Sequence, residues 1–302
     1  MGIDAVQLNF NPGALAALNW ILAIVMFGVA LDLRVADFRR VARAPLAPVV
    51  GLVCQFLLMP ALATGLLMLI RPAPSIALGI ILVAACPGGN VSNFFTSLGK
   101  GNAALSISMS AISTMASVVM TPFNFLFWGS VNPHTRELLQ SISLSPADIF
   151  TTVLTILILP TVLGMAARHW QPGWAARLLR PMRIFSILVL FAFVIGALQA
   201  NFGHFVEYIG VAFWVVLLVN ATALTLGYWM ARAVRLGAYD ARAVCFETGI
   251  QNSGFGLILC FNFFGGLGGM AIIAAWWGVW HLVTGLSLAS WWSRRPTGSA
   301  GD

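Results

Sequence analysis

Nine stretches of the sequence are apolar and long enough to cross a lipid bilayer as helices, and this repetition constrains the fold more than any other feature. A helix needs about 20 apolar residues to cross roughly 30 Å of hydrocarbon. The connections between the stretches are too short for a separate soluble domain. The sequence therefore predicts one all-α, polytopic membrane domain over residues 1–302. The nine stretches cover residues 13–33, 45–70, 76–98, 103–129, 146–168, 184–200, 208–231, 243–264 and 270–292.

The distribution of charge agrees with a membrane protein and predicts its orientation. Only 8% of residues are charged, whereas soluble domains have about a quarter. The net charge of +7 does not indicate a nucleic-acid partner, because the basic residues alternate with the spans and form no single patch. Nine spans place all lysines and arginines except Arg71 and Arg136 on one side. Because basic loops stay in the cytoplasm, we expect the N-terminus outside and the C-terminus inside.

Two of the spans contain sequence that weakens a helix. Residues 86–93 read Cys-Pro-Gly-Gly-Asn-Val-Ser-Asn, and residues 247–254 read Glu-Thr-Gly-Ile-Gln-Asn-Ser-Gly. Proline removes a backbone donor, and glycine is a poor helix former. Broken backbone at membrane depth is tolerated only inside the protein or beside a wet cavity. Interruptions at matching places in two antiparallel spans predict an inverted-repeat transporter whose site lies at two discontinuous helices.

Glu247 is the acidic residue that lies within a span and away from both of its edges. An ionised group there costs at least a few kcal/mol, so it must be paired, protonated or coordinated. At about 1.5 Å per residue from the cytoplasmic ends, Glu247, Asn93 and Ser106 lie about 8–10 Å deep and Ser110 about 15 Å. With Ser92, these oxygens form a set that suits a hard cation such as Na⁺.

Other interpretations of the same residues stay open. Glu247 could extend to the inner interface, pair with Arg242 or carry a proton. Each serine alone is better explained by helix packing or by a hydrogen bond to its own helix turn. His281 is equally well explained as a hydrogen-bonded interior residue. The sequence contains no HExxH, phosphate-binding loop, GxGxxG or GxSxG motif, so an enzyme is not predicted.

Three motifs together resemble the bile acid sodium symporter family. They are Pro-Gly-Gly-Asn-Val-Ser-Asn at 87–93, Lys-Gly-Asn-Ala-Ala-Leu-Ser at 100–106 and Glu-Thr-Gly-Ile-Gln-Asn at 247–252. The resemblance extends from about residue 24 to residue 292. It implies a core domain and a separate panel domain, with the two broken spans crossing inside the core. The core would contain the spans 45–70, 76–98, 103–129, 208–231, 243–264 and 270–292, and the panel the spans 13–33, 146–168 and 184–200.

The resemblance also implies the site residues. Two Na⁺ ions would be the coupling ions, with no other cofactor. The first sodium site would consist of Ser92, Asn93, Ser106, Ser110 and Glu247. The second would consist of Gln55, Glu247, Gln251 and the backbone carbonyls of Thr248 and Ile250. Substrate would bind near Asn90, Asn252 and His281.

The function implied is sodium-coupled symport of an organic anion into the cytoplasm across a bacterial inner membrane by alternating access. A bile acid and a small carboxylate such as pantoate or a keto acid both fit as the substrate. Membrane lipids are the further partners expected, and no obligate protein partner is inferred. Leu282 replaces an asparagine of some relatives, so the anion stays open. The alternatives are a proton-coupled or uncoupled carrier or exporter of the same superfamily, and a membrane receptor or scaffold that transports nothing.

Overall fold

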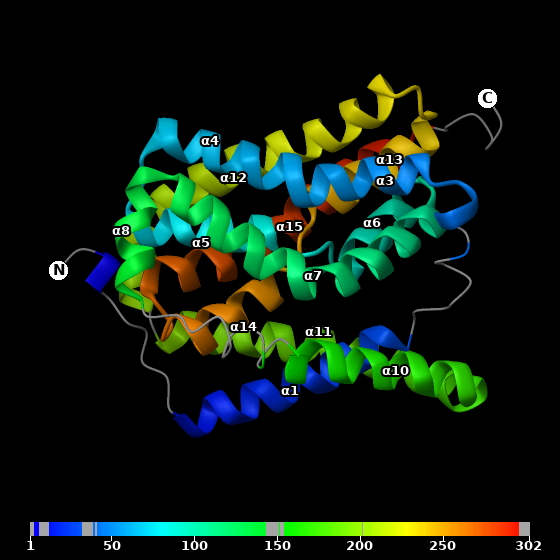
Figure 1. The fold of residues 1–302 in the computed structure, drawn as a ribbon, viewed down its shortest axis with the longest axis horizontal. Coiled ribbons are helices and arrows are strands. Elements are labelled where there is room, and N and C mark those ends of the chain that lie inside the picture. The colour runs from blue at the N-terminus through cyan, green and yellow to red at the C-terminus, as the bar shows by residue number, and fades with distance from the viewer. Residues whose placement is uncertain are drawn as a thin grey trace.

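The computed structural model describes residues 3–5, 12–31, 39, 41–142, 151, 154–200 and 202–295, and helices dominate these residues (Figure 1). Among the described residues, four helical stretches are long and apolar enough to cross a membrane: Leu46–Ile70, Ala103–Val131, Val206–Ala233 and Gly268–Ser293. Shorter apolar helices lie beside them, among them Pro74–Ala85 and Ser253–Phe263. The prediction of a helical membrane protein is therefore confirmed, whereas the number of nine spans remains a prediction.

The helices begin and end close to the predicted span boundaries, with three exceptions. The predicted span 184–200 is the second part of a longer helix, and the predicted spans 13–33 and 146–168 lie partly outside the described residues. The helices are α1 (Pro12–Ala30), α3 (Leu46–Val53), α4 (Met59–Ile70), α5 (Pro74–Ala85), α6 (Asn90–Leu98), α7 (Ala103–Val131), α8 (Pro133–Ser141), α10 (Leu159–Trp170), α11 (Pro172–Ala200), α12 (Phe202–Ala233), α13 (Ala238–Gly249), α14 (Ser253–Phe263) and α15 (Gly268–Ser293). Three short elements complete them: the 3-10 turn η1 (Ile3–Ala5) and the π-helical turns η2 (Cys54–Leu58) and η3 (Leu154–Ile158).

Both predicted interruptions are real breaks in the backbone. Helix α5 ends at Ala85, where Cys86 turns to an extended conformation immediately before Pro87. Helix α13 ends at Gly249, and α14 begins at Ser253. Because proline cannot continue the hydrogen-bonding pattern and glycine favours irregular backbone, these are the places where the helices stop.

The two breaks pair with each other. Gly88 and Gln251 form an isolated antiparallel bridge. The Gly89 amide donates to the Ile250 carbonyl at 3.2 Å, and the Asn252 amide donates to the Pro87 carbonyl at 2.8 Å. Backbone groups freed by one break therefore satisfy those freed by the other, which keeps both breaks hydrogen-bonded in the protein interior.

The helices pack in two groups. Helices α1, α10 and α11 contact one another and lie together at the bottom of the view in Figure 1. The paired breaks lie in the other group, where α5 packs on α15 and α12 packs on α13. Helix α5 is the centre of this group, because its residues from Ser75 to Ala85 are all buried. Helix α14 contacts α1 and joins the two groups.

Candidate functional site

The carboxylate of Glu247 is buried and surrounded by serine hydroxyls. Its Oε2 atom lies 2.7 Å from Ser92 Oγ on α6 and 3.5 Å from Ser106 Oγ on α7. Ser110 Oγ lies 2.9 Å from both carboxylate oxygens, and Ser113 Oγ lies 3.4 Å from Oε1. Only 1% of the Glu247 surface is exposed. The structure therefore brings a carboxylate from one broken helix to oxygens from the other broken helix and from α7.

Asn93 completes this group. Its Oδ1 atom accepts hydrogen bonds from Ser106 Oγ at 2.7 Å and from Ser110 Oγ at 3.2 Å. All five residues of the first predicted sodium set, Ser92, Asn93, Ser106, Ser110 and Glu247, are thus linked through hydrogen bonds. We call these five residues with Ser113 the carboxylate cluster.

The carboxylate cluster has more acceptor oxygens than protons to share among them. Each serine hydroxyl has one proton to donate. Ser110 faces both oxygens of Glu247 and also Asn93 Oδ1, and Ser92 faces both Glu247 and the Gly89 carbonyl, 2.7 Å away. A small hard cation binds oxygens of these types directly. The chemistry of the carboxylate cluster therefore fits Na⁺.

Ser113 is a member of this group that the sequence reasoning missed. Ser106, Ser110 and Ser113 follow the spacing i, i+4, i+7, so they share one face of α7. Ser108 lies off this face, and its hydroxyl donates to the Ala104 carbonyl of its own helix at 2.8 Å. Extending the helical face by one further turn would have found Ser113 from the sequence alone.

Arg242 does not pair with Glu247, which rules out that interpretation. Its guanidinium donates to the carbonyls of Gly99 at 2.8 Å, Trp292 at 3.3 Å and Arg295 at 2.8 Å. The guanidinium also lies 5.3 Å from the ring centroid of Trp292. A cation at the last carbonyls of α6 and α15 is favourable because helix C-termini carry partial negative charge. Arg242 thus links the ends of α6 and α15, and Glu247 forms no hydrogen bond to a basic side chain in the described part of the chain.

Position 88 requires glycine because the backbone of the first break lies directly against the carboxylate of Glu247. A Cβ atom at this position would overlap Glu247 Oε1. The absence of a side chain lets the extended segment of the first broken helix lie directly against the carboxylate of the second.

The second predicted sodium set lies around the two breaks. Gln55 lies on the π-helical turn η2, and its Nε2 atom donates to the Cys86 carbonyl at 2.6 Å. Gln251 donates to the Thr248 carbonyl. The Oε1 atoms of both glutamines are buried and have no hydrogen-bond partner. Two unpaired buried amide oxygens fit a cation site, although Gln55 and Glu247 are not hydrogen-bonded to each other.

Of the predicted substrate residues, the structure describes the side chains of Asn252 and His281, and it shows no hydrogen bond between these two. Asn252 accepts a hydrogen bond from the Phe255 amide at 3.0 Å and so caps α14. His281 on α15 is buried beside Trp277, and its Nε2 atom has no hydrogen-bond partner. One turn earlier on α15, Gly278 faces Ser253, whose hydroxyl lies 2.9 Å from the position of a Cβ atom. The side chain of Asn90 lies outside what the structure describes.

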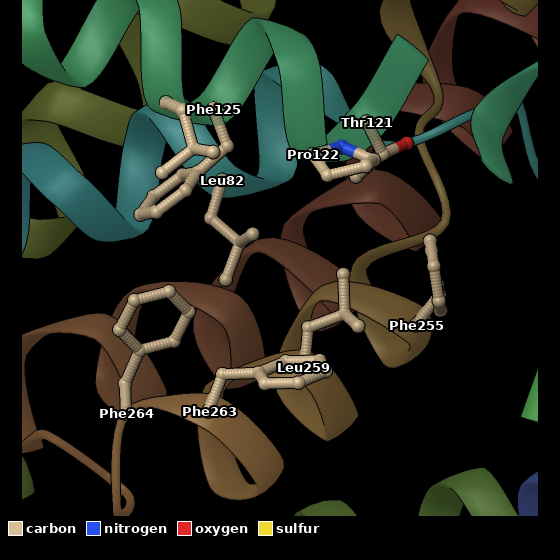
Figure 2. A pocket seen from close by; sticks show the side chains of 9 residues that line it. Leu82, Thr121, Pro122, Phe125, Phe255, Leu259, Phe263 and Phe264 are labelled. Atoms are coloured by element: carbon tan, nitrogen blue, oxygen red, sulfur yellow. The ribbon is translucent and has the colours of Figure 1, made fainter. Parts of the chain in front are cut away.

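A separate pocket lies between α5, α7 and α14, as Figure 2 shows. Its lining is apolar, and aromatic rings from Phe125, Phe255 and Phe264 surround it. The hydroxyl of Thr121 donates to the Ala85 carbonyl at 2.8 Å, so it supports the end of α5. The pocket therefore offers contact to apolar groups and no site for an ion.

These features define a helical membrane protein with a buried carboxylate, surrounded by hydroxyl groups, beside two paired broken helices. Residues 20–227 match the profile of the sodium bile acid symporter family. The chain belongs to this family, and the resemblance inferred from its motifs is confirmed.

Three relatives illustrate the range of the family. The chain is 31% identical over 274 residues to the uncharacterized sodium-dependent transporter YocS of Bacillus subtilis, covering 91% of this chain and 82% of that protein. It is 30% identical over 254 residues to the human ileal sodium/bile acid cotransporter, covering 82% of this chain and 70% of that protein. It is 31% identical over 247 residues to the rice chloroplastic protein BASS2, a probable sodium/metabolite cotransporter, covering 79% of this chain and 55% of that protein. Family members are sodium-coupled transporters, so the prediction that the chain is not an enzyme is confirmed.

Proposed function

We propose that this protein is a secondary active transporter that couples the entry of Na⁺ to the entry of an organic anion into the cytoplasm. The observation that carries the proposal is the buried Glu247 carboxylate, which is held by four serine hydroxyls and by no described basic side chain. A buried carboxylate without a cationic side chain needs either a proton or a cation. Membership of a sodium-dependent family favours Na⁺.

Two Na⁺ ions bind in this proposal, and both use Glu247. The first lies within the carboxylate cluster. The second lies at the breaks, between the unpaired oxygens of Gln55 and Gln251 and the carbonyls of Thr248 and Ile250. One negative charge shared by two monovalent cations leaves a net positive charge, which favours an anionic substrate nearby.

The substrate site lies where α6 and α14 begin. Both helices start at the paired breaks, so both direct the positive ends of their dipoles toward this region. Such an arrangement binds a carboxylate or sulfonate. In this proposal Asn90, Asn252 and His281 contact the anion, and a bile acid or a smaller acid such as pantoate or a keto acid fits this chemistry.

Transport proceeds by alternating access between two moving parts. Helices α1, α10 and α11 form the panel, and the helices that surround the paired breaks form the core. The two broken spans are corresponding members of an inverted repeat, and the N-terminus lies outside a bacterial inner membrane. Ion binding orders the breaks, anion binding follows, and the core then moves against the panel to open the site to the cytoplasm.

Uptake of labelled anions into proteoliposomes tests the proposal. We expect uptake from a panel of bile salts, pantoate and keto acids to depend on an inward Na⁺ gradient for at least one compound. Equal uptake in potassium or choline would contradict sodium coupling. Uptake that follows a pH gradient instead would identify a proton-coupled carrier, and saturable binding without flux would identify a receptor.

A further inference from the structure

The end of α13 leaves three successive carbonyls without their helical partners. In a continuous helix, the carbonyls of residues 248, 249 and 250 accept from the amides four residues later. The Asn252 amide instead donates to the Pro87 carbonyl, and the Ser253 amide lies 3.0 Å from the Gln251 carbonyl. Buried carbonyls must find other donors.

Each of the three carbonyls has a donor from a different source. Gln251 donates to the Thr248 carbonyl from within the break. The Gly89 amide donates to the Ile250 carbonyl from the other break. The Gly249 carbonyl accepts from Asn220 Nδ2 at 2.6 Å, and Asn220 is a fully buried residue of α12. A neighbouring helix therefore supplies the donor for the middle carbonyl.

Asn220 matches Gln55 at the other break. Gln55 Nε2 donates to the Cys86 carbonyl, also at 2.6 Å, and Cys86 follows the last residue of α5. In both cases the amide comes from the span that precedes the broken one. In both cases the amide oxygen is buried and has no hydrogen-bond partner. Asn220 and Gln55 thus perform the same local task at the two breaks.

Close packing between α12 and α13 keeps Asn220 in register with the break. A Cβ atom at Gly227 would lie 2.8 Å from Thr248 Cβ, and one at Gly249 would overlap Leu224. The two helices therefore approach each other closely at Gly249, the residue that Asn220 binds, and at the residue before it. Asn220 has little freedom to choose another acceptor.

We infer that Asn220 is a positioning residue for the second sodium site, because its hydrogen bond to Gly249 keeps the end of α13 unwound. Without this bond the Gly249 carbonyl recovers the Ser253 amide as its helical partner. The helix then winds through the break, and the carbonyls of Thr248 and Ile250 turn back into helical hydrogen bonds. The first sodium site depends on side chains of the carboxylate cluster and does not need this bond. The inference rests on the proposed function.

The test compares Asn220→Leu with Asn124→Leu. Asn124 is a suitable control because it is also buried, accepts one hydrogen bond, from Trp128, and has an unpaired amide nitrogen, but it lies on α7. Thermal unfolding of the detergent-purified chain is followed across a Na⁺ titration, with K⁺ replacing Na⁺ at constant ionic strength. For Asn220→Leu we expect the half-saturating Na⁺ concentration to rise about tenfold, and the Hill coefficient to fall from about two toward about one. Asn124→Leu should change only the unfolding temperature without Na⁺.

Two results would overturn the inference while leaving sodium coupling intact. One is an Asn220→Leu protein that is less stable but keeps the wild-type Na⁺ titration. The other is the same loss of Na⁺ affinity in both variants. If Asn220→Leu does not fold, Asn220→Ala removes the donor without adding bulk, and an unchanged Na⁺ titration in that variant likewise overturns the inference. Failure of the proposed function is distinguishable, because the wild-type protein itself would then show no Na⁺-dependent stabilisation.

Discussion

Ser110 Oγ lies 2.9 Å from both carboxylate oxygens of Glu247, although 137 residues separate the two in sequence. The contact joins α7, from the first half of the chain, to the second broken helix. Both residues are buried. Any movement that separates α7 from α13 therefore takes the Ser110 hydroxyl away from the Glu247 carboxylate. The geometry of the site thus depends on the packing of these two helices.

Replacing Glu247 by Gln should abolish sodium dependence. The amide keeps the size and shape of the side chain, but it removes the charge that attracts a cation and replaces one acceptor oxygen by a donor. We expect the half-saturating Na⁺ concentration for thermal stabilisation to rise by more than about tenfold and Na⁺-driven uptake to be lost. Glu137→Gln is the matched control, since Glu137 is exposed on α8. Wild-type Na⁺ titrations in Glu247→Gln would contradict the assignment.

Ser113→Ala tests whether the additional serine takes part in cation binding. Ser113 Oγ is 3.4 Å from Glu247 Oε1, farther than the hydroxyl of Ser110, so its effect should be the smaller one. We expect Na⁺ affinity to fall about three- to tenfold, as for the loss of one hydrogen bond. Ser108→Ala removes a hydroxyl that bonds to its own helix, and it should leave the Na⁺ titration unchanged. Equal effects of the two substitutions would assign Ser113 to helix packing.

Gly88→Ala should destabilise the paired breaks. The added methyl overlaps the Glu247 carboxylate, and overpacking of this kind costs about 1–3 kcal/mol. We expect a lower unfolding temperature and a weaker response to Na⁺, because the carboxylate must move. Gly65→Ala on α4 is the control, since a Cβ atom there meets no other atom within 4 Å. A Gly88→Ala protein with wild-type stability and Na⁺ response would contradict this prediction. It would show that the two breaks can move apart to accommodate the methyl group.

Arg242→Met should reduce stability without changing sodium affinity. The substitution leaves the carbonyls of Gly99, Trp292 and Arg295 without this donor, and we expect a loss of about 3 kcal/mol in the free energy of unfolding. Chemical denaturation with and without Na⁺ measures both quantities. Arg232→Met is the control, because Arg232 is exposed and donates to one carbonyl, that of Leu236. A large loss of Na⁺ affinity in Arg242→Met would indicate that Arg242 acts on the cation site.

Most residues of the carboxylate cluster could be predicted to lie together because their signals are local and rare. A membrane span seldom contains a carboxylate, and helix breaks at membrane depth require a reason. Counting residues from the cytoplasmic ends placed Glu247, Asn93 and Ser106 at similar depths. In the structure, Ser106 lies within hydrogen-bonding distance of both Asn93 and Glu247. Ser113 was missed because the prediction did not follow the helical face of α7 far enough.

The sequence by itself determined three things: the chain is a helical membrane protein, two of its helices break at known places, and one particular carboxylate is buried. Apolar length, proline and glycine decide these points, because they act through the local cost of exposing or losing backbone hydrogen bonds in lipid. Only the tertiary structure decided that Arg242 binds helix ends rather than Glu247, and that Asn220 donates to the Gly249 carbonyl. Five residues separate Arg242 from Glu247, yet their side chains bind different partners. Partner choice inside a bundle depends on which helices pack together, and long-range packing is not encoded in the spacing along one segment.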